Sequence, residues 1–376
     1  MDEVLHSFLE GKLSKEQFQA TLALHYTNEQ GLYEELRSCI QICIQSGRDE
    51  RTYEAFHHLL DMTAGISSLA IRKSLLEYMY AQLSPLEGIR SELLAKCSLL
   101  LAAVFEAEND YENLCSALET LEKHANLETD LEQLLLLRIR LGENYIKFGK
   151  PEKAILLMRT SMPIAHKTND HQLLMELQLC NARALDETLQ FLDAARSYYK
   201  ALQYKVPGNE IVFLENLSLA IQCLFLATPS QVVLQFLQEL SLLPNVKELP
   251  LYPFLNKYLK RNFVTPEDAN SILPFLLPHQ VQYMHTLIAN PKHFLETNLL
   301  FVSDFYEVAS LESLAKIFGI TTKELDSVLT NMIFQHRIRV TIDQFAGYVS
   351  FLPNSEKPLN RPNYIENLSQ ILNQYG

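Results

Sequence analysis

A repeat of 40 residues covers roughly residues 90–205 and constrains the fold of this chain more than any other feature. Apolar residues recur at matching places in three consecutive units, in the sets Leu94, Leu134 and Leu174; Cys97, Leu137 and Leu177; Phe105, Tyr145 and Leu185. Within each unit the apolar residues are spaced by three and four, and a polar turn then interrupts them. The pattern predicts helix–turn–helix pairs stacked into a right-handed α-solenoid of the tetratricopeptide (TPR) kind, because each pair alone leaves its apolar face exposed.

The turn inside the second unit supports this interpretation. Gly149 suits the left-handed backbone conformation that often ends a helix, because glycine has no side chain to clash there. Pro151 suits the first turn of the next helix, where its missing N–H costs nothing. The three turns are predicted at residues 106–110, 147–153 and 186–191.

The chain divides into four predicted segments. With 376 residues, of which 48% are hydrophobic, it can bury one large core or two to three ordinary ones. We predict a helical-repeat solenoid over residues 1–227. Residues 228–291 contain eight of the fifteen prolines and are predicted to form a bent connector of short helices. A winged helix over residues 292–353 and a short tail helix over residues 354–376 complete a mainly α fold.

Two helices are predicted at the start of residues 310–352. Ser310 suits the N-cap of a helix over 311–318, because its hydroxyl can accept a hydrogen bond from an otherwise unpaired N–H. Thr321 and Glu324 have the spacing of a capping box, in which each side chain satisfies a backbone N–H of the other residue. This pair predicts where the second helix begins.

Two short strands are predicted to follow the second helix. Their apolar residues alternate with polar ones, as in half-buried strands: Ile338, Val340, Ile342, Val349 and Phe351. Gly347 marks the turn between them. Two helices followed by a small antiparallel sheet form the outline of a winged helix, and a further helix over 292–308 is predicted to precede it.

Charge argues against a DNA-reading role for this module. The second helix of a DNA-binding winged helix enters the major groove and contacts bases through Arg, Lys, Asn or Gln. Here its outer face carries Thr322, Lys323, Glu324, Asp326 and Ser327. Residues 300–352 hold four basic and six acidic side chains, a net charge of −2, in a chain whose net charge is −13. Because carboxylates repel phosphates, a nucleic-acid binder is the weaker hypothesis.

An exposed sheet edge is the stronger hypothesis for the function of this module. The unpaired N–H and C=O groups of such an edge can pair with a strand of another chain. We therefore expect the interaction residues to lie in the two strands and their turn: Ile342, Asp343, Gly347, Val349 and Phe351.

The sequence offers no catalytic motif. None of the eleven histidines has another two residues away, so the H-x-H pair of a zinc metalloprotease is absent, as are phosphate-binding and nucleophile-elbow motifs. The six cysteines form no CxxC pair and sit within apolar helical patterns, as buried free thiols do. We expect no catalytic residue, no cofactor and no metal. The chain also lacks the pattern of a signal peptide and an apolar run long enough to span a membrane.

Three stretches resemble the PCI-domain family, whose members join helical repeats to a winged helix. They are LLPHQ at 276–280, TNLLFVSDFYEVASLESLAKIFGI at 297–320 and TIDQFAGYVSF at 341–351. Within that family they are most similar to the fourth-subunit branch of the COP-9 signalosome. The resemblance is clearest over about 272–352 and fainter over 94–205. One departure is local: the family usually has a glycine before the basic residue that enters the first strand, whereas His336 precedes Arg337 here.

This resemblance implies a non-catalytic scaffold. In such complexes PCI subunits associate through their winged helices, and a separate MPN/JAMM metalloprotease pair removes a ubiquitin-like modifier from the cullin of a cullin–RING ubiquitin ligase. The implied partners are other PCI subunits, the metalloprotease pair and the ligase, with no direct contact to nucleic acid or membrane. The implied location is the cytoplasm and nucleus. A PCI subunit of the proteasome lid or of an initiation-factor complex is the alternative.

Overall fold

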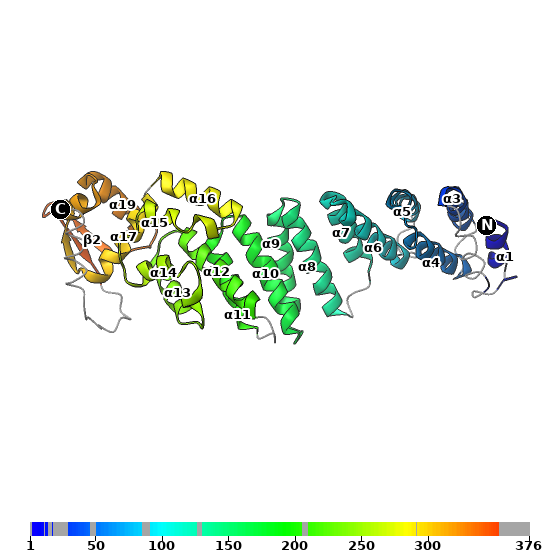
Figure 1. The fold of residues 1–376 in the computed structure, drawn as a ribbon, viewed down its shortest axis with the longest axis horizontal. Helices are drawn as coiled ribbons and strands as arrows, with labels where there is room; N and C mark the ends of the chain where they lie inside the picture. The colour runs from blue at the N-terminus through cyan, green and yellow to red at the C-terminus, as the bar shows by residue number, and fades with distance from the viewer. Residues whose placement is uncertain are drawn as a thin grey trace. The chain divides into compact units, whose positions relative to one another are not determined.

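The fold is seen in a computed structural model that describes residues 2–10, 12–13, 17, 29–45, 50–84, 91–125, 130–204, 210–290 and 292–352 (Figure 1). The chain forms two compact units, residues 1–184 and residues 185–376. The described parts are mainly helical, with one small antiparallel sheet near the C-terminal end, which confirms the predicted fold class. The predicted tail helix over 354–376 lies outside the described residues.

The first unit consists of helices that pack against their neighbours in the sequence. They are α1 (Asp2–Leu9), α3 (Glu29–Gln45), α4 (Glu50–Ala64), α5 (Leu69–Leu83), α6 (Ser91–Glu108), α7 (Tyr111–His124), α8 (Leu131–Lys147), α9 (Pro151–Ala165) and most of α10 (His171–Glu187). Helix α6 packs on α7, α7 on α8, and α8 on α9. These contacts bury the apolar faces that single helical pairs leave exposed.

The 40-residue repeat is confirmed by the backbone of its turns. Asn109, Gly149 and Leu189 lie 40 residues apart and all adopt the left-handed conformation, with φ of 57°, 74° and 60°. In each turn the next N–H donates to a carbonyl five residues earlier: Asp110 to Phe105, Lys150 to Tyr145 and Gln190 to Leu185. The same tight exit therefore ends α6, α8 and α10, although only one of the three positions is glycine.

A close approach of helices in the first unit depends on Gly142 of α8. A Cβ atom at this position would lie 2.9 Å from Cys180 Sγ and 2.9 Å from Met158 Cε. Leu135, Ile139 and Leu177 surround the contact and are buried. The cysteines confirm the expectation of buried free thiols, since all six are reduced and buried.

The second unit begins with longer helices and continues with short ones. They are α11 (Phe191–Gln203), α12 (Glu210–Leu226), α13 (Gln231–Ser241), η3 (Val246–Glu248), α14 (Tyr252–Leu259), α15 (Pro266–Asn270), η4 (Leu273–Phe275), α16 (Pro278–Ala289) and α17 (Lys292–Phe305). Prolines stand in the first turns of α14, α15, η4 and α16, where they interrupt no hydrogen bond. The boundary predicted at residue 227 falls inside this unit, because α12 packs against both α11 and α13.

Four aromatic rings form part of the core of the second unit. The centroid of Phe225 lies 4.7 Å from that of Phe254 and 5.1 Å from that of Tyr258, whose ring is 5.6 Å from Phe301. These residues come from α12, α14 and α17. The rings thus tie the region predicted as a connector to the helix that precedes the winged helix, since such edge-to-face and tilted pairs add to the free energy of burial.

The winged helix contains β1 (Val308–Ser310), α18 (Leu311–Phe318), α19 (Thr322–Phe334), β2 (Val340–Asp343) and β3 (Tyr348–Phe351). The predicted caps are confirmed: Ser310 accepts a hydrogen bond from the N–H of Ser313, and Thr321 and Glu324 form the capping box. The helix predicted over 292–308 is too long, because α17 ends at Phe305 and Val308 begins a strand.

Candidate functional site

The sheet of the winged helix has the strand order β1-β3-β2, so its central strand is β3. Val349 and Phe351 belong to this strand and are buried, with 0% and 4% of their surface exposed. The expectation that these two residues lie at a sheet edge is therefore wrong. They are core residues, because β3 pairs with β2 on one side and with β1 on the other.

Strand β2 supplies the edge next to the turn. The N–H of Leu352 donates to the carbonyl of Arg339. Because every second residue of an antiparallel strand bonds to the same neighbour, the backbone groups of Thr341 and Asp343 also point to β3. The backbone groups of Val340 and Ile342 then point away from β3. Within the described residues no strand pairs with that outer side. Of the five expected residues, Ile342 is thus the one whose backbone groups face outward from an edge strand.

Asp343 and Gly347 shape the turn between β2 and β3. One Asp343 carboxylate oxygen accepts hydrogen bonds from the N–H groups of Phe345 and Ala346, at 3.0 and 2.9 Å. Gly347 has φ of 70°, and its carbonyl accepts from the N–H of Leu311 at 2.9 Å. The two residues hold the turn in a fixed shape, as aspartate and glycine do in many turns.

Several apolar side chains of the winged helix are exposed, and the sequence patterns missed them. Phe345 stands in the turn with its side chain fully exposed, and half or more of the surface of Val308, Tyr348, Leu352 and Phe334 is exposed. A signal in the sequence could have revealed Phe345: it is an aromatic residue in a turn, outside the alternation that marks the buried positions of the strands. Exposed aromatic side chains such as Phe345, Tyr348 and Phe334 are common where a protein contacts a partner.

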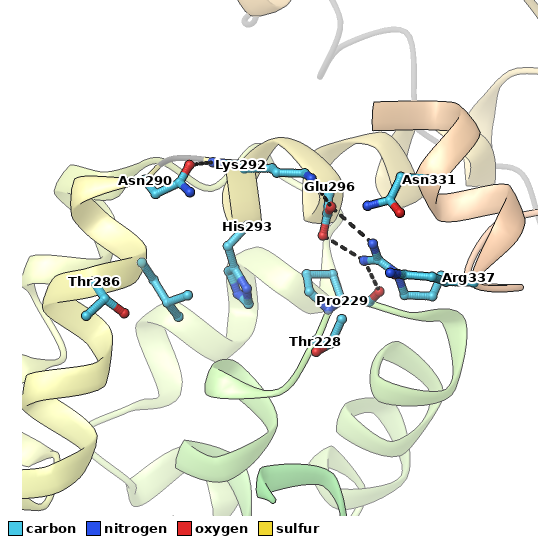
Figure 2. Close-up of a pocket in the computed structure, with 11 residues that line it drawn as sticks. Thr228, Pro229, Thr286, Asn290, Lys292, His293, Glu296, Asn331 and Arg337 are labelled. Atoms are coloured by element: carbon cyan, nitrogen blue, oxygen red, sulfur yellow. Dashed lines mark hydrogen bonds and ion pairs between the residues drawn. The ribbon is translucent and has the colours of Figure 1, made fainter. Parts of the chain in front are cut away.

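Arg337 connects this module to the helices before it (Figure 2). Its guanidinium donates to both carboxylate oxygens of Glu296 on α17, at 2.6 and 3.1 Å, and to the carbonyl of Pro229 at 3.2 Å. The side chains of Arg337 and Glu296 are 9% and 8% exposed. The preceding residue, His336, has φ of 55°, so histidine adopts the left-handed conformation in which a glycine was expected. The segment before β2 therefore directs the Arg337 side chain to α17.

Figure 2 shows the surroundings of this ion pair, a pocket of about 420 Å³ between α16, α17 and the end of α19. His293 lines the pocket, and burial lowers its pKa to about 4, although the nearby Glu296 acts in the opposite direction. The imidazole is consequently neutral at physiological pH. Arg337 and Glu296 satisfy each other, so the pocket is a joint between helices rather than a site with unpaired charge.

The LLPHQ stretch forms a second buried polar joint at the start of α16. Gln280 donates from its amide nitrogen to both oxygens of Asp186, at 3.0 and 2.8 Å, and both residues are almost fully buried. His279 Nε2 lies 3.1 Å from Asp186 and Nδ1 lies 3.3 Å from Glu187. Burial lowers the pKa of His279, but the hydrogen bond and the two carboxylates outweigh it, so the pKa is raised.

The described residues show neither a metal cluster nor a membrane-spanning helix. No group of three or more His, Cys, Asp or Glu side chains among them could hold a metal ion. No helix in the described ranges is long and apolar enough to cross a membrane. The outer face of α19 begins with the capping box, where hydrogen bonds from Thr321 lower the pKa of Glu324, so a carboxylate stands where a DNA reader would present basic residues.

Comparison with known proteins places this geometry in a family. Residues 282–353, which span most of α16 through β3, match the PCI domain. The full chain is 53% identical to COP9 signalosome complex subunit 4 of Schizosaccharomyces pombe, with all of both proteins aligned. The corresponding subunit of Arabidopsis thaliana is 26% identical over 73% of this chain and 71% of its own length. That of Drosophila melanogaster is 24% identical over 78% of this chain and 73% of its own length. The chain therefore belongs to the family of COP9 signalosome complex subunit 4.

Proposed function

We propose that this protein is a non-catalytic scaffold subunit of a signalosome that removes a ubiquitin-like modifier from cullin–RING ubiquitin ligases. The observation that carries the proposal is the outer side of β2, an edge without a paired strand in the described residues, on a winged helix that lies within the matched PCI domain. A strand of a neighbouring PCI subunit can extend the sheet there through main-chain hydrogen bonds.

The proposed partners follow from the family. They are the other PCI subunits, the MPN/JAMM metalloprotease pair and the cullin–RING ligase, and the proposed location is the cytoplasm and nucleus. The function requires no catalytic group of this chain, which agrees with the lack of a hydrolytic motif in its sequence. A scaffold function needs only assembly through β2 and support of the metalloprotease by the remaining helices.

Proline substitutions test the role of the β2 edge. Proline lacks an N–H and is tolerated on an edge strand where that N–H faces outward. We expect Ile342→Pro to leave the thermal unfolding of the isolated chain almost unchanged and to abolish co-purification with PCI subunits. Thr341→Pro is the matched variant, because its N–H faces β3 and its loss should lower the unfolding temperature as well.

Two results would contradict the proposal. Assembly of the Ile342→Pro variant at the wild-type level would exclude β2 as the contact. Affinity purification of the wild-type chain followed by mass spectrometry should recover the metalloprotease pair and cullins. Recovery of proteasome ATPases or of initiation factors instead would favour the alternative PCI complexes.

A further inference from the structure

A second pocket lies at the end of the sheet where β2 turns into β3. Its volume is about 570 Å³, and its walls are the first turns of α18 and α19 and the turn after β2. The residues that matter for its chemistry are Glu312, Lys323, Asp326, Gln344 and Tyr348. The pocket is separate from the joint around Arg337 and takes no part in the attachment of the winged helix.

Asp326 on α19 has an unsatisfied carboxylate oxygen. Its Oδ2 accepts a hydrogen bond from the amide nitrogen of Gln344 at 3.0 Å. Its Oδ1 is buried and has no hydrogen-bond partner among the described residues. A buried charged acceptor without a donor is costly, so a cation placed in the pocket above Asp326 would offset part of this cost.

The other polar groups of the pocket favour the same kind of ligand. Gln344 uses its nitrogen on Asp326, which leaves its carbonyl oxygen as the free end. Glu312 adds a second, exposed carboxylate, and Lys323 is the single basic residue of the lining. In the described part of the chain neither Glu312 nor Lys323 forms an ion pair. The lining therefore carries a net charge of −1, and it offers the carbonyl oxygen of Gln344 and the carboxylate of Glu312 to a ligand.

We propose that this pocket receives an arginine side chain of a partner protein, and this inference rests on the proposed assembly function. A guanidinium is planar, always charged and has five N–H donors, so it can serve several separated acceptors at once, whereas lysine presents a single point charge. Tyr348, which lines the pocket, is the register partner of Asp343 at the end of β2. A strand added along β2 would end next to the pocket, and the arginine would fix its register.

A titration of the isolated full-length chain tests the pocket without assembly. The probes are N-acetyl-arginine amide and its neutral analogue N-acetyl-citrulline amide, followed through the methyl NMR signals of Leu311 and Ala346, two lining residues. We expect saturable shifts with the arginine probe in the millimolar range and at least tenfold weaker binding of the citrulline analogue. Equal responses to arginine and citrulline, or no response to arginine, would overturn the inference.

Three variants locate the binding. Asp326→Asn keeps the acceptor for Gln344 but removes the charge, and it should weaken arginine binding at least fivefold. Lys323→Gln removes the competing cation and should strengthen it. Glu239→Gln makes the same charge change as Asp326→Asn on an exposed position of α13 outside the pocket and should leave binding unchanged. If the Asp326→Asn variant binds arginine like the wild type, the probe binds elsewhere and the pocket is not an arginine site.

The two proposals fail in distinguishable ways. If arginine binds the pocket but the wild-type chain recovers no signalosome subunits, the proposed function fails and the arginine site stands. If the chain enters the complex and the titration shows no arginine response, the pocket inference fails alone. When both hold, Asp326→Asn combined with Glu312→Gln should lower the affinity of the chain for its PCI neighbours about tenfold, with Glu239→Gln as the control.

Discussion

At the scale of single residues, Arg337 attaches the winged helix to the helices before it. Its guanidinium satisfies the Glu296 carboxylate and the carbonyl of Pro229 at the same time. A buried ion pair of this kind adds little to stability compared with apolar packing, but the loss of one partner leaves an uncompensated charge. The pair therefore acts mainly as a specific connection between α17 and the segment that joins α19 to β2.

Replacement of Arg337 should measure that connection. We expect Arg337→Ala to lower the free energy of unfolding by about 3–5 kcal/mol, because the buried Glu296 carboxylate loses both of its hydrogen-bond donors and keeps only the more exposed Lys292, 3.9 Å away. Urea denaturation followed by circular dichroism measures the change. Arg339→Ala is the matched control, since Arg339 is exposed two residues away, and its effect should stay within about 0.5 kcal/mol. Equal effects of the two variants would show that the ion pair of Arg337 with Glu296 is not the cause of the destabilisation.

His336 holds a backbone conformation that disfavours most side chains. The substitution His336→Gly should raise the free energy of unfolding by about 1 kcal/mol, because glycine reaches positive φ without a steric cost. The substitution His336→Val should lower it, since branched side chains tolerate the left-handed region less well than histidine does. Thermal unfolding of the two variants should therefore give shifts of opposite sign. A destabilised glycine variant would show that the imidazole itself contributes to the fold.

At the scale of helices, the repeat shows how one backbone geometry is made from different residues. The exits of α6, α8 and α10 share their φ values and hydrogen bonds, yet they use Asn109, Gly149 and Leu189. The geometry is fixed by the turn and by the burial of the helices on either side. The residue with positive φ then determines the steric cost of each turn, which is lowest for glycine.

Reciprocal substitutions at two of these turns should have opposite effects. Gly149→Ala should lower the free energy of unfolding by about 1 kcal/mol through the backbone alone, since nothing lies within 4 Å of the added Cβ. Leu189→Gly should raise it by a similar amount, because the leucine is 46% exposed and loses little packing. Chemical denaturation of both variants gives the comparison. A loss of stability in Leu189→Gly would mean that packing of the leucine outweighs its strain.

Elements with strong local signals could be predicted from the sequence, and elements fixed by pairing could not. Ser310 and Thr321 predicted where α18 and α19 begin, because an N-cap acts within a few residues of the helix that it starts. Strand β1 has three residues, too few to show alternation, and it exists because β3 pairs with it. The same pairing placed β3 in the centre of the sheet, which no local pattern reveals. The partner of Arg337 was hidden too, 41 residues away in sequence.

At the scale of the whole molecule, the buried His293 and the partly buried His279 should make stability depend on pH in opposite directions. The folded pKa of His293 lies at about 4, below the ordinary value of about 6.5, so its unfolded form binds the proton first and stability falls as the pH drops from about 6.5 towards 4. The raised pKa of His279 means that its contribution is complete below about 6.5 and is lost as the pH rises through the folded pKa.

Denaturation curves at several pH values separate these contributions. We expect His279→Gln to cost more stability at pH 5.5 than at pH 8.5. A neutral replacement of His293, such as His293→Gln, should cost less at pH 5 than at pH 8, because the wild type has already lost part of its stability at the lower pH. The wild type measured in parallel corrects for the carboxylates. Parallel pH profiles of the wild type and both variants would contradict both assignments.

The strand order β1-β3-β2 has a consequence for how subunits can be arranged. Both outer strands are antiparallel to β3, so they run in the same direction, and they present different side chains: Val308 on β1, and Thr341 and Asp343 on β2. The two edges of the sheet therefore differ chemically. A neighbour that suits one side does not suit the other, so a row of these modules has a polarity and each member a defined predecessor and successor. The order of subunits along such a row can thus be encoded in a few edge residues.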